Sequence, residues 1–195
     1  MIDIIFSTDF FFTTIRVMTP ILFAALACMV FTKGGIDSIG TEGIMLSCAL
    51  AGPLGSYFTK SAFMGVLVAM IIGAILACLF GYVTISLKSE PVLAGIALNT
   101  LASGLTIFVI YYTTGEKGST QSLMSPTVPN IEIPILKEIP IIGEIFSGHS
   151  LLTYFGLLIM VLLAFFIYRT PAGLRIRSVG ENPEAAKSVG ISVGK

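Results

Sequence analysis

Five long apolar stretches are the feature that most restricts the fold of this chain. They cover residues 10–31, 42–58, 62–87, 92–113 and 151–168. About 20 apolar residues cross a bilayer as a helix, so each stretch is close to the required length. With 55% hydrophobic and 11% charged residues, a soluble fold of this size could not bury its apolar surface. The sequence therefore predicts an all-α, polytopic membrane protein with about five transmembrane helices.

Charge and motif content exclude several other classes of protein. Eleven Lys and Arg balance eleven Asp and Glu, which leaves no basic field for nucleic acid. The cysteines Cys28, Cys48 and Cys78 lie inside apolar stretches without ligand spacing, and His149 has no carboxylate pair near it in sequence. Residues 190–195 do not have the spacing of a phosphate-binding loop. We therefore expect no catalytic residue, no cofactor, no metal site and no nucleic-acid partner.

The distribution of basic residues predicts the orientation of the chain. One set of connections carries Lys33, Lys88 and the five basic residues of the tail, whereas the other carries Lys60, Lys117 and Lys137. The more basic side is expected to be cytoplasmic. This places the N-terminus and loop 114–150 outside and divides the chain into a transmembrane domain, 1–168, and a cytoplasmic tail, 169–195. Within the proline-rich outer loop we expect a short element at 139–146.

Small residues recur every four positions along the third stretch. At this spacing they share one helical face and let two membrane helices approach closely, so they predict a helix–helix contact. The residues are Gly65, Ala69, Gly73, Ala77 and Gly81.

Polar residues inside the apolar stretches are candidates for a translocation path. In the fourth stretch Gly95, Asn99, Ser103 and Thr106 are expected to share a stripe, and Glu42 begins the second stretch. Two interpretations of the stripe stay open, a hydrogen-bonded contact with a neighbouring helix and the lining of a polar path. Glu42 can equally complement a helix N-terminus.

The tail carries the local signals of a short helix. Asn182 is a good N-cap, Pro183 suits the first helical position, and Gly190 suits the stop. These signals predict a helix over 183–189. A helix of two turns is marginal alone, so we expect it to dock on another surface.

Four segments resemble the permeases of ATP-binding-cassette importers of the branched-chain amino acid, ribose and nucleoside type. The most specific is 169–194, which contains GLRIRSVGENPEAAKSVGI and is similar to the coupling loop of that family. The others are 34–49, 95–106 and 133–146, in the family's order. The resemblance is nearest to permeases for nucleosides, then simple sugars, that work with binding proteins of the basic-membrane-lipoprotein type.

The resemblance implies a role and a set of partners. The chain would be a permease subunit in a prokaryotic plasma membrane, passing a small polar solute inward. It would work with a separate ATPase subunit, a second permease subunit and an extracytoplasmic binding protein. Family members continue with further spans, so the resemblance also implies a truncated or fragmentary chain, or one half of a split gene product. The residues implied in ATPase coupling are Gly180, Glu181, Asn182, Pro183, Glu184, Ala185, Ala186 and Gly190.

A secondary transporter or channel subunit is the alternative. Such a protein would call for buried ionisable residues or an inverted repeat. The apolar stretches offer Arg16 and Glu42 as ionisable residues and no convincing repeat.

Overall fold

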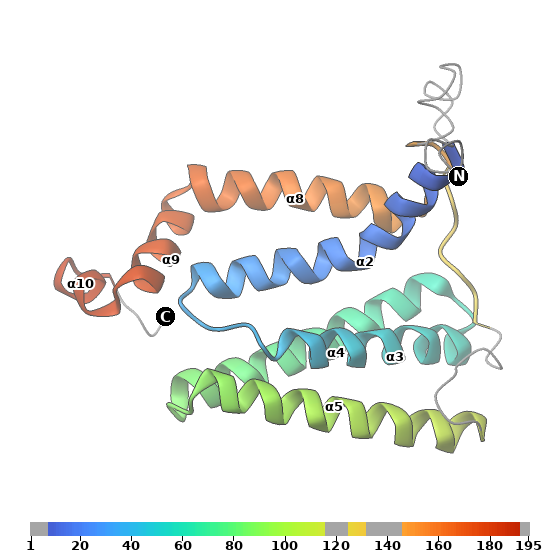
Figure 1. Cartoon of the computed structure of the whole chain (residues 1–195), viewed down its shortest axis with the longest axis horizontal. Helices are drawn as coiled ribbons and strands as arrows, with labels where there is room; N and C mark the ends of the chain where they lie inside the picture. Colours follow the sequence, from blue (N-terminus) through green and yellow to red (C-terminus); the bar gives the residue numbers. More distant parts are fainter. Residues whose placement is uncertain (1–7, 116–124, 132–145, 192–195) are drawn as a thin grey trace. The chain divides into compact units, whose positions relative to one another are not determined.

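The computed structural model describes residues 8–115, 125–131 and 146–191, most of which form helices (Figure 1). One isolated antiparallel bridge pairs Asn130 with Ser150. The greater part of the expected element at 139–146 lies outside the described residues. The helices are α2 Thr8–Lys33, α3 Thr41–Thr59, α4 Ala62–Gly81 with its π-helical extension η1 Tyr82–Ser86, α5 Pro91–Thr114, α8 Leu151–Arg169, α9 Pro171–Glu181 and α10 Pro183–Ser188.

Four of these helices are long and apolar enough to cross a membrane. They are Thr8–Lys33, Ala62–Ser86, Pro91–Thr114 and Leu151–Arg169. The expected fifth span is also a helix, α3, but its Gly, Ser and Thr residues with Glu42 and Pro53 lower its apolar content. Only 11% to 28% of each spanning segment is buried inside the structure, so most apolar side chains face outward, as they do toward lipid. The chain is an all-α, polytopic membrane protein.

The chain folds as two compact units. One is Met1–Gly35 with Val128–Lys195 and carries α2, α8, α9 and α10; the other is Ile36–Thr127 and carries α3, α4 and α5. These units are defined by which helices pack on one another. The expected division at residue 168 is defined by the membrane boundary instead, and it stays a prediction.

The α3–α4 pair of the second unit is built on close backbone approach. A Cβ added at Gly65 would lie 2.7 Å from the carbonyl oxygen of Gly52 and 2.8 Å from the Cβ of Ser56. At Gly73 an added Cβ would lie 2.8 Å from the Sγ of Cys48. At Gly65 the neighbours are backbone and Cβ atoms, so α3 and α4 can pack this closely only because that residue is glycine, whereas at Gly73 the neighbour is the end of the Cys48 side chain.

The rest of the α4 stripe lies in looser surroundings. Ala69 lies in ordinary van der Waals range of Gly52, 3.9 Å from the position of an added Cβ. Ala77 is half-buried, and a Cβ at Gly81 would meet nothing within 4 Å. The close contact therefore uses the first half of the stripe.

In the first unit, α2 and α8 pack side by side with a polar contact between them. The hydroxyls of Thr19 and Thr153 lie 3.0 Å apart and are both buried. Next to them, Gly156 makes room for the ring of Phe23, which an added Cβ would approach to 3.2 Å. At the end of this pair Phe12 stacks on the buried His149, with ring centroids 4.3 Å apart.

We predict opposite outcomes for two alanine substitutions in the α4 stripe. Gly65→Ala forces α3 and α4 apart and lowers the free energy of unfolding by about 1–3 kcal/mol, as overpacking of a tight contact does. Gly81→Ala adds a methyl group to open space and leaves stability unchanged or slightly raised, since alanine favours a helix. Thermal unfolding of the purified variants in one detergent measures both, and equal effects would contradict the packing described here.

Candidate functional site

The short helix α10 begins and ends as its sequence predicts. The side-chain oxygen of Asn182 accepts hydrogen bonds from the backbone N–H groups of Glu184, at 3.1 Å, and Ala185, at 3.0 Å. Pro183 occupies the first turn. Gly190 ends the helix with a positive φ of 83°, and its N–H donates to the carbonyl of Lys187. The predicted helix over 183–189 is confirmed as Pro183–Ser188.

One face of α10 packs on α9 and the opposite face is exposed. Ala186 is 3% exposed, and its carbonyl accepts a hydrogen bond from the N–H of Ile191. Glu184, Ala185 and Lys187 are exposed, and Val189 just past the helix is 74% exposed. Ala186 thus belongs to the interior of the tail, while the exposed face carries both charge signs and an apolar side chain.

The tail contains a second helix that the sequence analysis missed. In α9 the hydroxyl oxygen of Thr170 accepts a hydrogen bond from the N–H of Gly173, at 3.1 Å, and Pro171 occupies the first turn. A Cβ at Gly173 would overlap the carbonyl of Phe166, so the corner from α8 into α9 requires glycine. Thr170–Pro171 repeats the cap-and-proline signal of Asn182–Pro183, and this signal could have revealed α9.

Helix α9 is held against the end of α2 by two glycines. A Cβ at Gly180 would overlap the carbonyl oxygen of Lys33 and lie 2.8 Å from the amide nitrogen of Gly35. A Cβ at Gly35 would in turn lie 2.8 Å from the Cα of Gly180, and Gly35 has a positive φ of 80°. The two backbones are therefore in direct contact, with no side chain between them.

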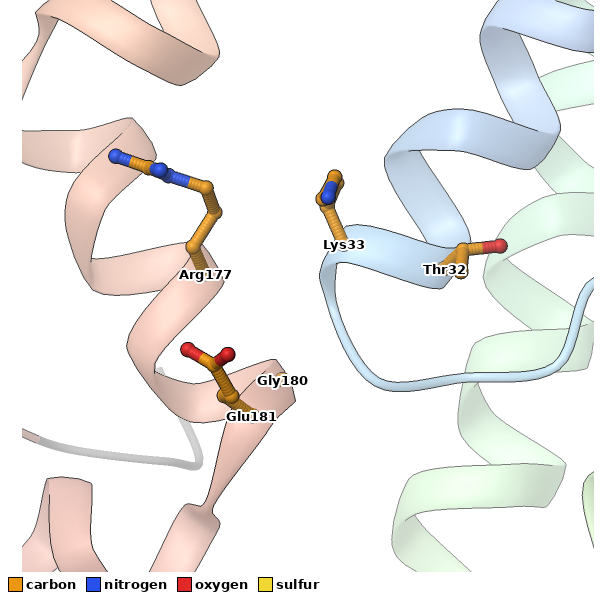
Figure 2. Close-up of a pocket in the computed structure, with 5 residues that line it drawn as sticks. All are labelled: Thr32, Lys33, Arg177, Gly180 and Glu181. Carbon is orange, nitrogen blue, oxygen red and sulfur yellow. The ribbon is translucent and has the colours of Figure 1, made fainter.

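A polar cavity of about 260 Å³ lies beside this contact (Figure 2). Its lining residues are Thr32 and Lys33 at the end of α2 and Arg177, Gly180 and Glu181 on α9, as labelled in Figure 2. The guanidinium carbon of Arg177 lies 5.2 Å from the centre of the Tyr168 ring, a cation–π distance. The Nε atom of Arg177 is buried and has no hydrogen-bond partner among the described residues.

In the second unit, Asn99 joins α5 to the backbone at the start of α3. Its Oδ1 accepts a hydrogen bond from the N–H of Gly43, at 2.7 Å, and its Nδ2 donates to the carbonyl of Ile39, at 3.0 Å. A Cβ at Gly95 would lie 2.8 Å from the amide nitrogen of Gly40, so the glycine-rich segment touches α5 directly. Asn99 thus satisfies backbone groups that no α-helical hydrogen bond satisfies, which a membrane interior demands.

The other residues predicted to line a translocation path differ in burial: some lie on the buried face of α5 and others are exposed. The buried face of α5 carries Gly95, Leu98, Ala102, Thr106 and Ile110. Ser103 is exposed, because it follows Ala102 by one residue and hence by about 100° around the helix. Thr106 is 8% exposed and its Oγ1 has no hydrogen-bond partner among the described residues. Glu42 is exposed in the first turn of α3.

Metal-binding groups do not gather in the part of the chain that the structure describes. No cluster of three His, Cys, Asp or Glu side chains occurs there.

Comparison with known proteins identifies the family. Residues 10–195 match the family described as the permease component of branched-chain amino acid transport systems. The chain belongs to this family.

Three relatives are about equally similar to this chain. It is 31% identical to the nucleoside ABC transporter permease protein NupC of Lactococcus lactis, over 90% of the chain and 56% of the relative. It is 32% identical to the guanosine ABC transporter permease protein NupQ of Bacillus subtilis, over 93% of the chain and 59% of the relative. It is 33% identical to a putative glucose ABC transporter permease protein, TsgC13 of Haloferax volcanii, over 93% of the chain and 54% of the relative. The chain thus spans somewhat more than half the length of these relatives, and no solved structure matches it.

We predict that the packing of α9 on α2 depends on Gly180. Gly180→Ala pushes α9 away from the carbonyl of Lys33 and lowers the free energy of unfolding by about 1–3 kcal/mol. Gly104→Ala is the matched control, because an added Cβ there meets nothing within 4 Å. Thermal unfolding in detergent compares the two, and a harmless Gly180→Ala would show that α9 does not touch α2.

Proposed function

We propose that this chain forms part of the transmembrane permease of an ATP-binding-cassette importer, which carries a nucleoside or a simple sugar across a prokaryotic plasma membrane. The observation that carries the proposal is the capped helix α10, which packs on α9 and leaves its other face exposed. Family membership supports the permease role, and the printed names of the three relatives support the solute class. The chain itself acts as a transport subunit, and ATP hydrolysis belongs to a separate ATPase.

The exposed face of α10 is the proposed docking surface for the ATPase. Its charged pair, Glu184 and Lys187, and the apolar Val189 offer ionic and hydrophobic contacts to a partner groove. The coupling segment 180–190 lies on the cytoplasmic side in this proposal, as the distribution of basic residues predicts. A second permease subunit and an extracytoplasmic binding protein complete the assembly.

The packing of α9 supplies a route for the motion. When the ATPase moves α10, α9 moves with it because Ala186 is buried in the tail. Gly180 touches the backbone of Lys33 and Gly35, so a shift of α9 displaces the end of α2 directly. Packed helices pass on displacements of this kind as small rigid shifts.

We predict that cross-linking to the ATPase follows the exposed face of α10. In a variant without native cysteines, Val189→Cys and Ala185→Cys should cross-link to a co-expressed ATPase subunit. Ala186→Cys, in the same helix but 3% exposed, should react far less and is the matched control. Mass spectrometry of the cross-linked product gives the readout. Labelling of Val189→Cys from the outer side of the cell alone would contradict both the orientation and the ATPase contact.

The polar residues of α5 and the start of α3 are the proposed border of the solute path. Both ends of the Asn99 amide are engaged with backbone groups, so Asn99 acts by positioning the start of α3. Ser103 and Glu42 are exposed and have polar groups available for a solute. Thr106 is buried on the packed face, with a hydroxyl that has no hydrogen-bond partner among the described residues.

We predict that Asn99 and Ser103 affect uptake in different ways. Asn99→Leu leaves the N–H of Gly43 unsatisfied, so it lowers stability by about 1–3 kcal/mol and reduces the maximal rate of uptake. Ser103→Ala leaves stability unchanged and raises the KM for solute. Radiolabelled solute uptake by cells expressing the whole transporter measures both, with Thr100→Ala, which bonds only within α5, as the control. Unchanged uptake in both variants would remove α5 from the path.

A further inference from the structure

We propose that the cavity between the end of α2 and α9 binds the phosphate group of an anionic phospholipid. The cavity is lined by two basic residues, Lys33 and Arg177, and Glu181 is its one acidic residue. The structure records no ion pair that joins either cation to Glu181. Its lining therefore carries a net positive charge that the described part of the chain leaves uncompensated.

The buried Nε atom of Arg177 is the second observation. A buried N–H without a hydrogen-bond partner is rare in folded proteins and calls for an explanation, often an ion or water at the site. A phosphate oxygen is a strong acceptor for the guanidinium group. One water molecule occupies ~30 Å³ in the liquid. The cavity volume of about 260 Å³ is several times larger, so the cavity can hold a phosphate group.

The position of the cavity favours a lipid as the source of the phosphate. Lys33 is the last residue of the spanning helix α2, and Tyr168, which contacts Arg177, is one residue before the end of the spanning helix α8. Tyrosine and lysine at such helix ends lie at the level of the lipid headgroups. Basic pockets between spanning helices at this level are suited to anionic headgroups.

Binding of a headgroup would also stabilise the contact between α9 and α2. The lining residues come from both helices, so a phosphate bound to Lys33 and Arg177 bridges them beside the Gly180–Gly35 contact. The lipid composition of the membrane would then affect how firmly α9 is held to α2. This inference needs α2 and α8 to span the membrane, and it does not depend on the identity of the solute or of the ATPase.

The test measures lipid bound to the purified full chain by native mass spectrometry. The chain is placed in nanodiscs of phosphatidylcholine mixed with phosphatidylglycerol and then released with its bound lipids. We expect retention of phosphatidylglycerol over phosphatidylcholine, and a loss of about fivefold in this preference for Lys33→Gln or Arg177→Gln. Glu181→Gln removes the opposing charge and should strengthen retention, so it tests the site even where a cation variant folds poorly.

Two controls separate this site from general attraction and from a soluble anion. Arg175→Gln removes the same charge from an exposed position of α9 outside the cavity and should keep the wild-type preference. A comparable loss in Arg175→Gln, or weaker retention in Glu181→Gln, would overturn the proposal. Inorganic phosphate is added as a competitor. If it displaces the lipid, and if the variants rank in the same order for phosphate binding as for lipid retention, the cavity binds a soluble anion and the lipid source is overturned.

Discussion

Backbone polar groups at the ends of helices must find partners, and in this chain a few side chains meet that need. Asn99 bonds the backbone on both sides of the break before α3, while Thr170 and Asn182 cap α9 and α10. The backbone groups that they bond have no partner inside a helix, so these three side chains fix where helices start. The tail is built in the same way: each of its two helices begins with a capping side chain followed by proline.

Close backbone contact is the second device, and glycine makes it possible. The hydrophobic effect does not drive helices together in lipid, because lipid tails are as apolar as the side chains. The association of membrane helices therefore depends on van der Waals contact at short range. Gly65 and Gly73 bring α4 onto α3, and Gly180 brings α9 onto the end of α2. The last contact matters for the proposed function, because it links the surface offered to the ATPase with a spanning helix through rigid backbone.

Sequence reasoning succeeded where the signal is local or depends on composition alone. The apolar stretches predicted the helices to within a few residues, since the hydrocarbon thickness sets their length. The Asn182–Pro183 signal predicted α10. The same reasoning did not extend to α9, although Thr170–Pro171 carries the same signal. The stripe on α5 was a weaker guide, since Ser103 is exposed while Leu98 and Ala102 are buried.

The sequence by itself determined the class of protein, the long apolar helices and the start of α10, because each follows from hydropathy or from neighbouring residues. Tertiary structure alone decided which groups meet across the chain. It placed Asn99 against the N–H of Gly43, 56 residues away, and it buried Ala186 while exposing Val189. It also brought Arg177 to one cavity with Lys33. Such meetings depend on the packing of whole helices, which no local pattern of residues specifies.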